Sequence, residues 1–136
     1  MTQSNSLFPS SPDSALPERV GKVFLPLCQV VPPETISTIK ESVAGHLQQM
    51  ERQVTQNEFL DLKTAGRITD LLHQLLDDYA KYNERQRALI VGAARYFVKG
   101  DDAEHDTHSF LGLDDDVLVL NYVLDSTGNK DKRITL

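Results

Sequence analysis

The sequence predicts an all-α fold, a bundle of four or five helices whose last two helices form a hairpin around an acidic loop. In residues 34–54 and 58–82, apolar residues recur at alternating steps of three and four, which places them on one face of a helix. Residues 84–98 are apolar nearly all round, which is typical of a helix enclosed by others. An acid-rich loop separates that segment from a further apolar helix, residues 114–126. Helices of this kind pack around one core.

The length of the chain, 136 residues, predicts a single domain that buries a core without metals or disulfides. We place this helical domain at residues 19–128. Before it, residues 1–18 are rich in Ser and Pro and hold too few apolar residues to offset the entropy of ordering them, so a flexible tail is expected. After it, residues 129–136 form a polar tail with three basic residues that could fold back onto the acids.

The charge and hydropathy of the chain exclude two classes of protein. Its net charge is −6 and its pI is near 5.1, whereas a general nucleic-acid binder needs a basic surface, so no nucleic-acid partner is expected. The longest nearly apolar run, Ala88 to Val98, is interrupted by Arg95 and is about half the ~20 residues that a membrane helix needs. The N-terminus lacks the apolar core of a secretion signal. We therefore expect a cytoplasmic protein without a membrane span.

The first apolar segment, residues 20–31, predicts a short or kinked helix that packs on the core. It contains Gly21 and Pro26, and a proline inside a helix removes a hydrogen-bond donor and clashes with the preceding turn. Cys28 lies in this segment and is the single cysteine of the chain, so it forms no internal disulfide. We interpret it as a small buried apolar residue rather than a reactive thiol.

The helix over residues 34–54 begins after Pro33, which suits a first turn. His46 lies beside its apolar stripe and is interpreted as a boundary residue rather than a ligand. The same stripe could pair with a second chain, which would make the protein a homo-oligomer, but packing within one chain is preferred. The stripe consists of Ile36, Ile39, Val43, Leu47, Met50 and Val54.

The helix over residues 58–82 carries two features of interest besides its apolar face. Gly66 lies in the middle, where glycine costs about 1 kcal/mol relative to alanine, and we expect it to mark a close contact with a neighbour. His73 follows Asp70 by three residues and precedes Asp77 by four, so the three could share one face as half of a metal site. A solvated charged face is the preferred interpretation. The apolar face consists of Phe59, Leu62, Ala65, Ile68, Leu72, Leu75, Leu76 and Tyr79.

Asn83 is expected to cap the helix over residues 84–98, and Gly100 is expected to end it. Tyr96 and Phe97 should belong to the core. The last helix, residues 114–126, should be closed by Gly128. Its residues available to the core are Val117, Leu118, Leu120, Val123 and Leu124.

Between Asp101 and Asn129 the chain has eight carboxylates and no Lys or Arg. A helix N-terminus explains one or two aspartates at residues 114–116, because carboxylates there accept bonds from free backbone N–H groups. It does not explain three together with further acids in the preceding loop, because like charges repel. Three compensations are open: a divalent cation such as Mg²⁺ or Ca²⁺, the nearby cation Arg95, or exposure to solvent. The acids concerned are Asp102, Asp106, Asp115 and Asp116.

A transition metal is a narrower form of the same hypothesis, with His105 and His108 as additional ligands. Their spacing of three residues would place both on one side of a helix. No phosphate-binding Gly-rich loop, CxxC or HExxH motif and no nucleophile triad is evident. Apart from a divalent cation, no cofactor is expected.

The spacing of five anchors within residues 88–124 resembles the YkvA-type family of small bacterial helical proteins, whose domain has no assigned function. Tyr96 is followed by Asp102 after six residues and by Asp106 after four more. Gly112 follows after six, and the pair Asp115 and Asp116 begins three residues later. The resemblance implies a helical fold and supplies no reaction.

We therefore expect a YkvA-like, non-enzymatic binding or adaptor module. Its acidic loop would be the recognition surface for a protein partner with a basic surface. The alternative is a metal-dependent hydrolase that uses the Asp cluster as metal ligands.

Overall fold

A computed structural model of the protein describes residues 16–53, 59–104 and 113–134, and side chains are described for 16–52, 62–98 and 113–134. Every regular element in these ranges is helical, which confirms the predicted all-α bundle. The α-helices are α1 (Glu18–Phe24), α2 (Pro33–Gln53), α3 (Phe59–Asp77), α4 (Glu84–Glu104) and α5 (Leu113–Ser126). Three short 3₁₀ turns, η1 (Leu25–Leu27), η3 (Tyr79–Lys81) and η5 (Lys130–Lys132), follow α1, α3 and α5.

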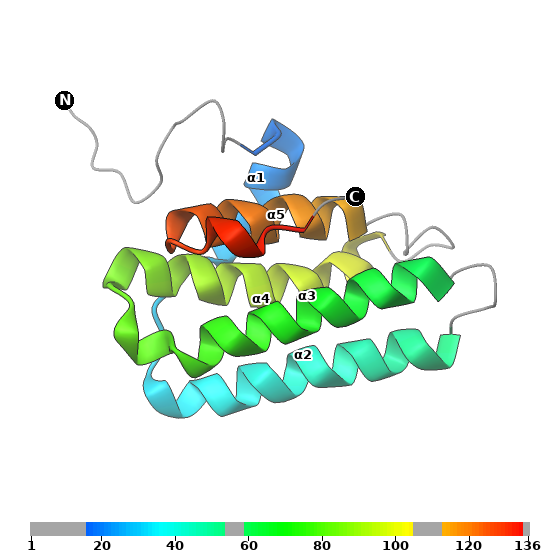
Figure 1. The fold of residues 1–136 in the computed structure, drawn as a ribbon, viewed down its shortest axis with the longest axis horizontal. Coiled ribbons are helices and arrows are strands. Elements are labelled where there is room, and N and C mark those ends of the chain that lie inside the picture. Colours follow the sequence, from blue (N-terminus) through cyan, green and yellow to red (C-terminus); the bar gives the residue numbers. More distant parts are fainter. Residues whose placement is uncertain (1–15, 54–58, 105–112, 135–136) are drawn as a thin grey trace.

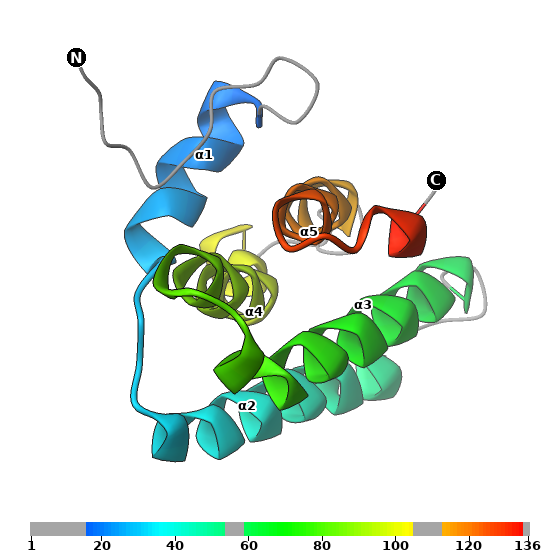
Figure 2. The ribbon, with the colours of Figure 1, turned by 60° about the vertical axis from the view of Figure 1, so that its left-hand side comes forward.

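The four long helices lie with their axes close to one direction in Figure 1. Helix α2 packs against α3 and α4, while α5 packs against α3 and α4 from another side. Figure 2 shows α4 and α5 nearly end-on, with the α2 and α3 pair running obliquely beneath them. The short helix α1 leans on α4 and α5, and the chain then descends past α4 to reach α2. Helix α4 therefore contacts all the other α-helices.

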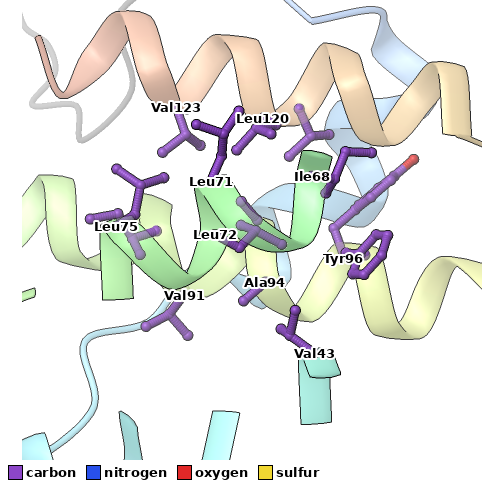
Figure 3. Packing of buried hydrophobic residues seen from close by; sticks show 14 of the residues in the cluster. Val43, Ile68, Leu71, Leu72, Leu75, Val91, Ala94, Tyr96, Leu120 and Val123 are labelled. Atoms are coloured by element: carbon purple, nitrogen blue, oxygen red, sulfur yellow. The ribbon is translucent and has the colours of Figure 1, made fainter. Parts of the chain in front are cut away.

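The core lies where α3, α4 and α5 meet, with α2 closing one side. In Figure 3, Leu120 and Val123 of α5 point toward Leu71 of α3. Tyr96 and Phe97 are buried, with 7% and 1% of their surface exposed, as the all-round apolar pattern of α4 predicts. The largest fully buried side chains include Phe24, Ile68, Leu71, Leu72, Leu76, Leu89, Ile90, Leu120 and Leu124.

The predicted cap of α4 is confirmed. The Gln86 N–H donates to Asn83 Oδ1 at 2.8 Å, and the Asn83 N–H donates to Gln86 Oε1 at 3.0 Å. This reciprocal pair satisfies two backbone donors at the start of the helix. At the other end, the prediction that Gly100 ends the helix is wrong, because α4 continues to Glu104. Glycine weakens a helix by about 1 kcal/mol but does not prevent it from continuing.

Two further predictions need correction near α3 and α5. The helix expected over residues 58–82 ends at Asp77. There Arg87 donates to the carbonyls of Tyr79 and Ala80 at 3.0 and 2.7 Å, so these carbonyls serve another helix instead of extending α3. In α5, Leu118 is 41% exposed and does not join the core. Its expected place is taken by Val119 and Tyr122, which are buried.

The mid-helix glycine that meets a neighbour is Gly92, and the expectation for Gly66 is wrong. A Cβ atom on Gly66 would have nothing within 4 Å. A Cβ atom on Gly92 would lie 2.9 Å from Phe24 Cε1 and 3.2 Å from Cys28 Cα. Glycine at residue 92 therefore lets α1 and the chain after it approach α4 closely. Gly128 closes α5 as predicted, with a φ of 79°.

The ends of the described domain are tied to the bundle. Leu16 packs against the core, and the Pro17 carbonyl accepts bonds from Val20 N–H and Gly21 N–H at 3.0 and 2.9 Å. Near the C-terminus, Asn121 holds Ile134 through two hydrogen bonds of 2.9 and 2.8 Å. The segment 129–134 thus lies along α5.

Candidate functional site

The acidic residues predicted as a site fall into a described and an undescribed part. Asp106, His105 and His108 lie outside the described residues, and of Asp102 only the backbone position within α4 is described. The cation hypotheses that use these four side chains therefore remain predictions. The described part is the first turn of α5, with Asp114, Asp115 and Asp116.

The basic partner of Asp115 is Arg19 of α1. Arg19 Nη1 donates to Asp115 Oδ2 at 2.7 Å, and Nη2 donates to Oδ1 at 3.0 Å. The guanidinium thus engages both carboxylate oxygens in a bidentate pair. Asp114 beside it is exposed, and Asp116 is half-buried. The acids at the start of α5 are therefore compensated in part by a cation that lies 96 residues earlier in the chain.

Arg95 does not serve as the cation of Asp115. Its Nη1 donates to Gln29 Oε1 at 2.9 Å, in the segment that links η1 to α2. Within the described residues, Arg95 forms no ion pair. The prediction that it compensates the acids is corrected for Asp115, whose two oxygens are both bonded to Arg19.

Arg95 lies instead at a cavity of about 220 Å³ between η1, α2 and α4. The cavity is lined by Leu27, Ile39, Ser42, Ala94, Arg95 and Val98. Ala94 and Ile39 are buried and form its floor, whereas Ser42 is exposed and lies at its rim with the half-buried Arg95. On α4, Ala94 and Val98 are four residues apart and so share one face. The arrangement is an apolar recess with one cation at its edge.

The link between η1 and α2, residues 28–32, is bonded to Tyr79 at Val31. The Tyr79 hydroxyl donates to the Val31 carbonyl at 2.8 Å and accepts from the Val31 N–H at 2.9 Å. Both bonds are buried. They satisfy the backbone N–H and the carbonyl of Val31, which lies between η1 and α2 and has no helical hydrogen bonds of its own. This hydroxyl holds the link between η1 and α2 that carries Gln29, the hydrogen-bond partner of Arg95 on α4.

Cys28 follows η1 directly and carries a free thiol whose pKa is raised. It is half-buried, and its Sγ donates to the Phe24 carbonyl at 3.4 Å. Burial raises the pKa of the Cys28 thiol from 9.0 to about 12. A thiol with such a pKa remains protonated near neutral pH and is a poor nucleophile. The geometry supports the interpretation of Cys28 as a packing residue.

The two histidines whose side chains are described, His46 and His73, each contact a neighbouring helix. His73 Nε2 lies 3.2 Å from the Lys40 carbonyl of α2, and Asp77 forms an ion pair with Lys40. His46 is buried, and its ring meets Phe97 edge-on with centroids 4.8 Å apart. Among the residues whose side chains are described, no group of three His, Cys, Asp or Glu is placed to hold a metal ion. His73 and Asp77, which the sequence offered as part of a metal site, thus lie at the interface between α2 and α3.

Comparison with known proteins adds no relative: no family model, curated protein or solved structure matches this chain. The YkvA-type resemblance therefore rests on the spacing of its five anchors alone. The described helices include none with the length and the apolar content that crossing a membrane requires.

Of the cavity residues, the sequence predicts Arg95 as a binding residue, but with the nearby acids as its partner. For the apolar lining residues, the sequence predicts only a place in the core. One local signal was present, because Ala94 is a small residue on a helical face that otherwise carries the larger residues Ile90, Val91, Phe97 and Val98. A small residue on such a face leaves space, but the sequence does not state which helices face each other.

Proposed function

We propose that this chain is a cytoplasmic, non-enzymatic binding module of the YkvA-like type, which binds a basic protein partner at its acidic end. The acidic end is defined as residues 101–116, which include the first turn of α5. The observation that carries the proposal is the charge distribution at this turn. Asp115 has its cation within the chain, in Arg19, whereas Asp114 is exposed and forms no ion pair among the described residues. The negative charge at the first turn of α5 is therefore only partly compensated by cations of the described residues.

The physical basis of the proposal is electrostatic complementarity. Residues 101–116 carry seven carboxylates and no Lys or Arg. Although Asp115 is paired with Arg19, we expect the net negative charge of this segment to attract cationic groups. Such a field raises the association rate of a basic partner and disfavours an acidic one. Because exposed charges are screened by salt, binding of this kind weakens as ionic strength rises.

A direct test is a titration with a fluorescent Lys-rich peptide at low and at high salt. We expect the variant Asp102→Asn, Asp106→Asn, Asp114→Asn to bind about tenfold more weakly at low salt, equivalent to about 1.4 kcal/mol. The matched control, Glu34→Gln, Glu41→Gln, Glu51→Gln, removes the same charge from exposed positions of α2. Equal weakening in both variants would show general charge attraction and contradict a site at the acidic end.

The metal-dependent hydrolase is the competing outcome, with Asp102, Asp106, Asp115 and Asp116 as ligands. The Arg19 pair favours the binding module, because a guanidinium engages both oxygens of Asp115 that a metal would need. Thermal melts with Mg²⁺, Ca²⁺, Mn²⁺, Zn²⁺ and EDTA separate the two. A metal-dependent rise in the midpoint that disappears in the Asp102→Asn, Asp106→Asn, Asp114→Asn variant would support the hydrolase and overturn the proposal.

A further inference from the structure

We propose that the cavity between η1, α2 and α4 binds a small monocarboxylic acid with an apolar body, and that Arg95 binds its carboxylate. This site is separate from the acidic end, and the proposal does not rest on the binding of a basic partner. It follows from the lining, the cation and the size of the cavity.

The lining of the cavity is apolar on its floor and sides. Ile39 and Ala94 are buried, and the half-buried Leu27 and Val98 complete the walls. An apolar group that leaves water to fill such a recess is stabilised in proportion to the area it buries. Most small-molecule sites have this character, a largely apolar hollow with few polar groups that fix the orientation of the ligand.

The polar group at the rim is a cation. Arg95 Nη1 donates to Gln29 Oε1, which uses one of the five N–H donors of the guanidinium. Gln29 is neutral, so this bond orients the guanidinium without compensating its charge. No ion pair involves Arg95 among the described residues. A carboxylate at the rim would accept the remaining donors, and guanidinium and carboxylate match in a bidentate geometry.

The volume limits the apolar body of the ligand. The cavity measures about 220 Å³, whereas an engineered apolar cavity of ~150 Å³ in another protein holds benzene. One aromatic ring or a short aliphatic chain therefore fits, and a long lipid chain does not. The net charge of −6 also bears on selectivity, since the protein as a whole repels anions and an acid binds only where a local cation compensates.

The test uses octanoate, with octanol and octylamine as neutral and cationic ligands of the same chain length. We expect calorimetric titration to give the tightest binding for octanoate. Arg95→Gln should weaken octanoate binding about tenfold or more while leaving octanol binding unchanged. The control Arg67→Gln removes an exposed cation from α3 and should bind octanoate like the parent protein. Equal binding of octanoate by the parent and Arg95→Gln proteins would overturn the assignment of the carboxylate to Arg95.

A second pair of variants tests the cavity itself. Ser42→Phe fills the rim from an exposed helical position and should abolish binding of octanoate and octanol, while Thr38→Phe, exposed on α2 outside the lining, should not. Circular dichroism melts verify that both variants fold. Light scattering completes the test: a dimer that dissociates on Ser42→Phe would show that a second copy of the chain covers the cavity and would overturn the ligand proposal.

Discussion

The hydroxyl of Tyr79 holds both backbone polar groups of Val31, donating to its carbonyl at 2.8 Å and accepting from its N–H at 2.9 Å. The two residues are 48 positions apart, and the contact closes the link between η1 and α2 onto the turn that follows α3. One side chain thereby holds the link that follows Leu27, the residue of η1 that lines the cavity.

Tyr79→Phe should destabilise the protein by about 1 to 3 kcal/mol, because it leaves a buried N–H and a buried carbonyl without partners. Denaturant unfolding measures this loss. Tyr82→Phe is the matched control, since the Tyr82 hydroxyl accepts one half-buried bond from Asn129 at 3.2 Å. A loss for Tyr79→Phe no greater than that of the control would show that the link is not held by this hydroxyl.

Gly92→Ala should destabilise the protein, although alanine is the better helix former. The added methyl group would lie 2.9 Å from Phe24 Cε1 and 3.2 Å from the Cys28 backbone, so α1 or α4 must shift. Overpacking of this kind costs about 1 to 3 kcal/mol.

Gly66→Ala is the control for this comparison, because its added Cβ has nothing within 4 Å. The helix propensity of alanine should then stabilise α3 by about 0.5 to 1 kcal/mol. Opposite signs of the two changes in unfolding free energy are the expected result. Two changes of the same sign would indicate that α1 does not press on α4.

Asp115→Asn should lower stability by about 0.2 to 1 kcal/mol, because it removes the charge that Arg19 engages, and the Arg19 side chain is 69% exposed. The loss should shrink at high salt and should not depend on added metal. Asp114→Asn serves as the control, since it removes an equivalent charge from the same helix terminus without an ion pair. A double-mutant cycle with Arg19→Gln measures the coupling, and a coupling of zero would contradict the pair.

The Cys28 thiol should resist alkylation in the native protein at pH 8 and react after unfolding, because burial raises its pKa to about 12. The same shift affects stability. The folded state holds the thiol proton more tightly than the unfolded state, whose thiol ionises near its ordinary pKa of 9.0. This contribution to stability is complete below pH 9 and is lost as pH rises from about 9 to about 12.

Cys28→Ser measures that contribution by difference, since serine does not ionise in this range. Burial also raises the pKa of Tyr122, and the charge of Cys28 raises it further, so both proteins lose stability at high pH and the difference between them includes the effect of Cys28 on Tyr122. The expected result is a steeper loss in the parent. If the unfolding free energies of the two proteins fell in parallel as the pH rises, the Cys28 thiol would be solvated in the folded state.

The sequence by itself determined the elements that depend on neighbours a few residues apart. The three-and-four spacing of apolar residues predicted α2 and α3, and dense apolar runs predicted α4 and α5, although α3 ends at Asp77 rather than at residue 82 and α4 continues to Glu104. The cap at Asn83 and the burial of Tyr96 and Phe97 were also predicted from local patterns. These features are local because helix periodicity and capping join residues within about one turn.

Only the tertiary structure decided which apolar faces meet and which charges pair. Periodicity shows that a helix has an apolar face but not which helix covers it, so it did not place Leu118 in solvent or Gly92 against α1. The contacts that define the candidate cavity and the acidic end join residues 48, 66 and 96 positions apart. Such distances close only when the whole bundle assembles. For this reason the sequence identified Arg95 and Asp115 as residues of interest, and the fold gave each of them a different partner.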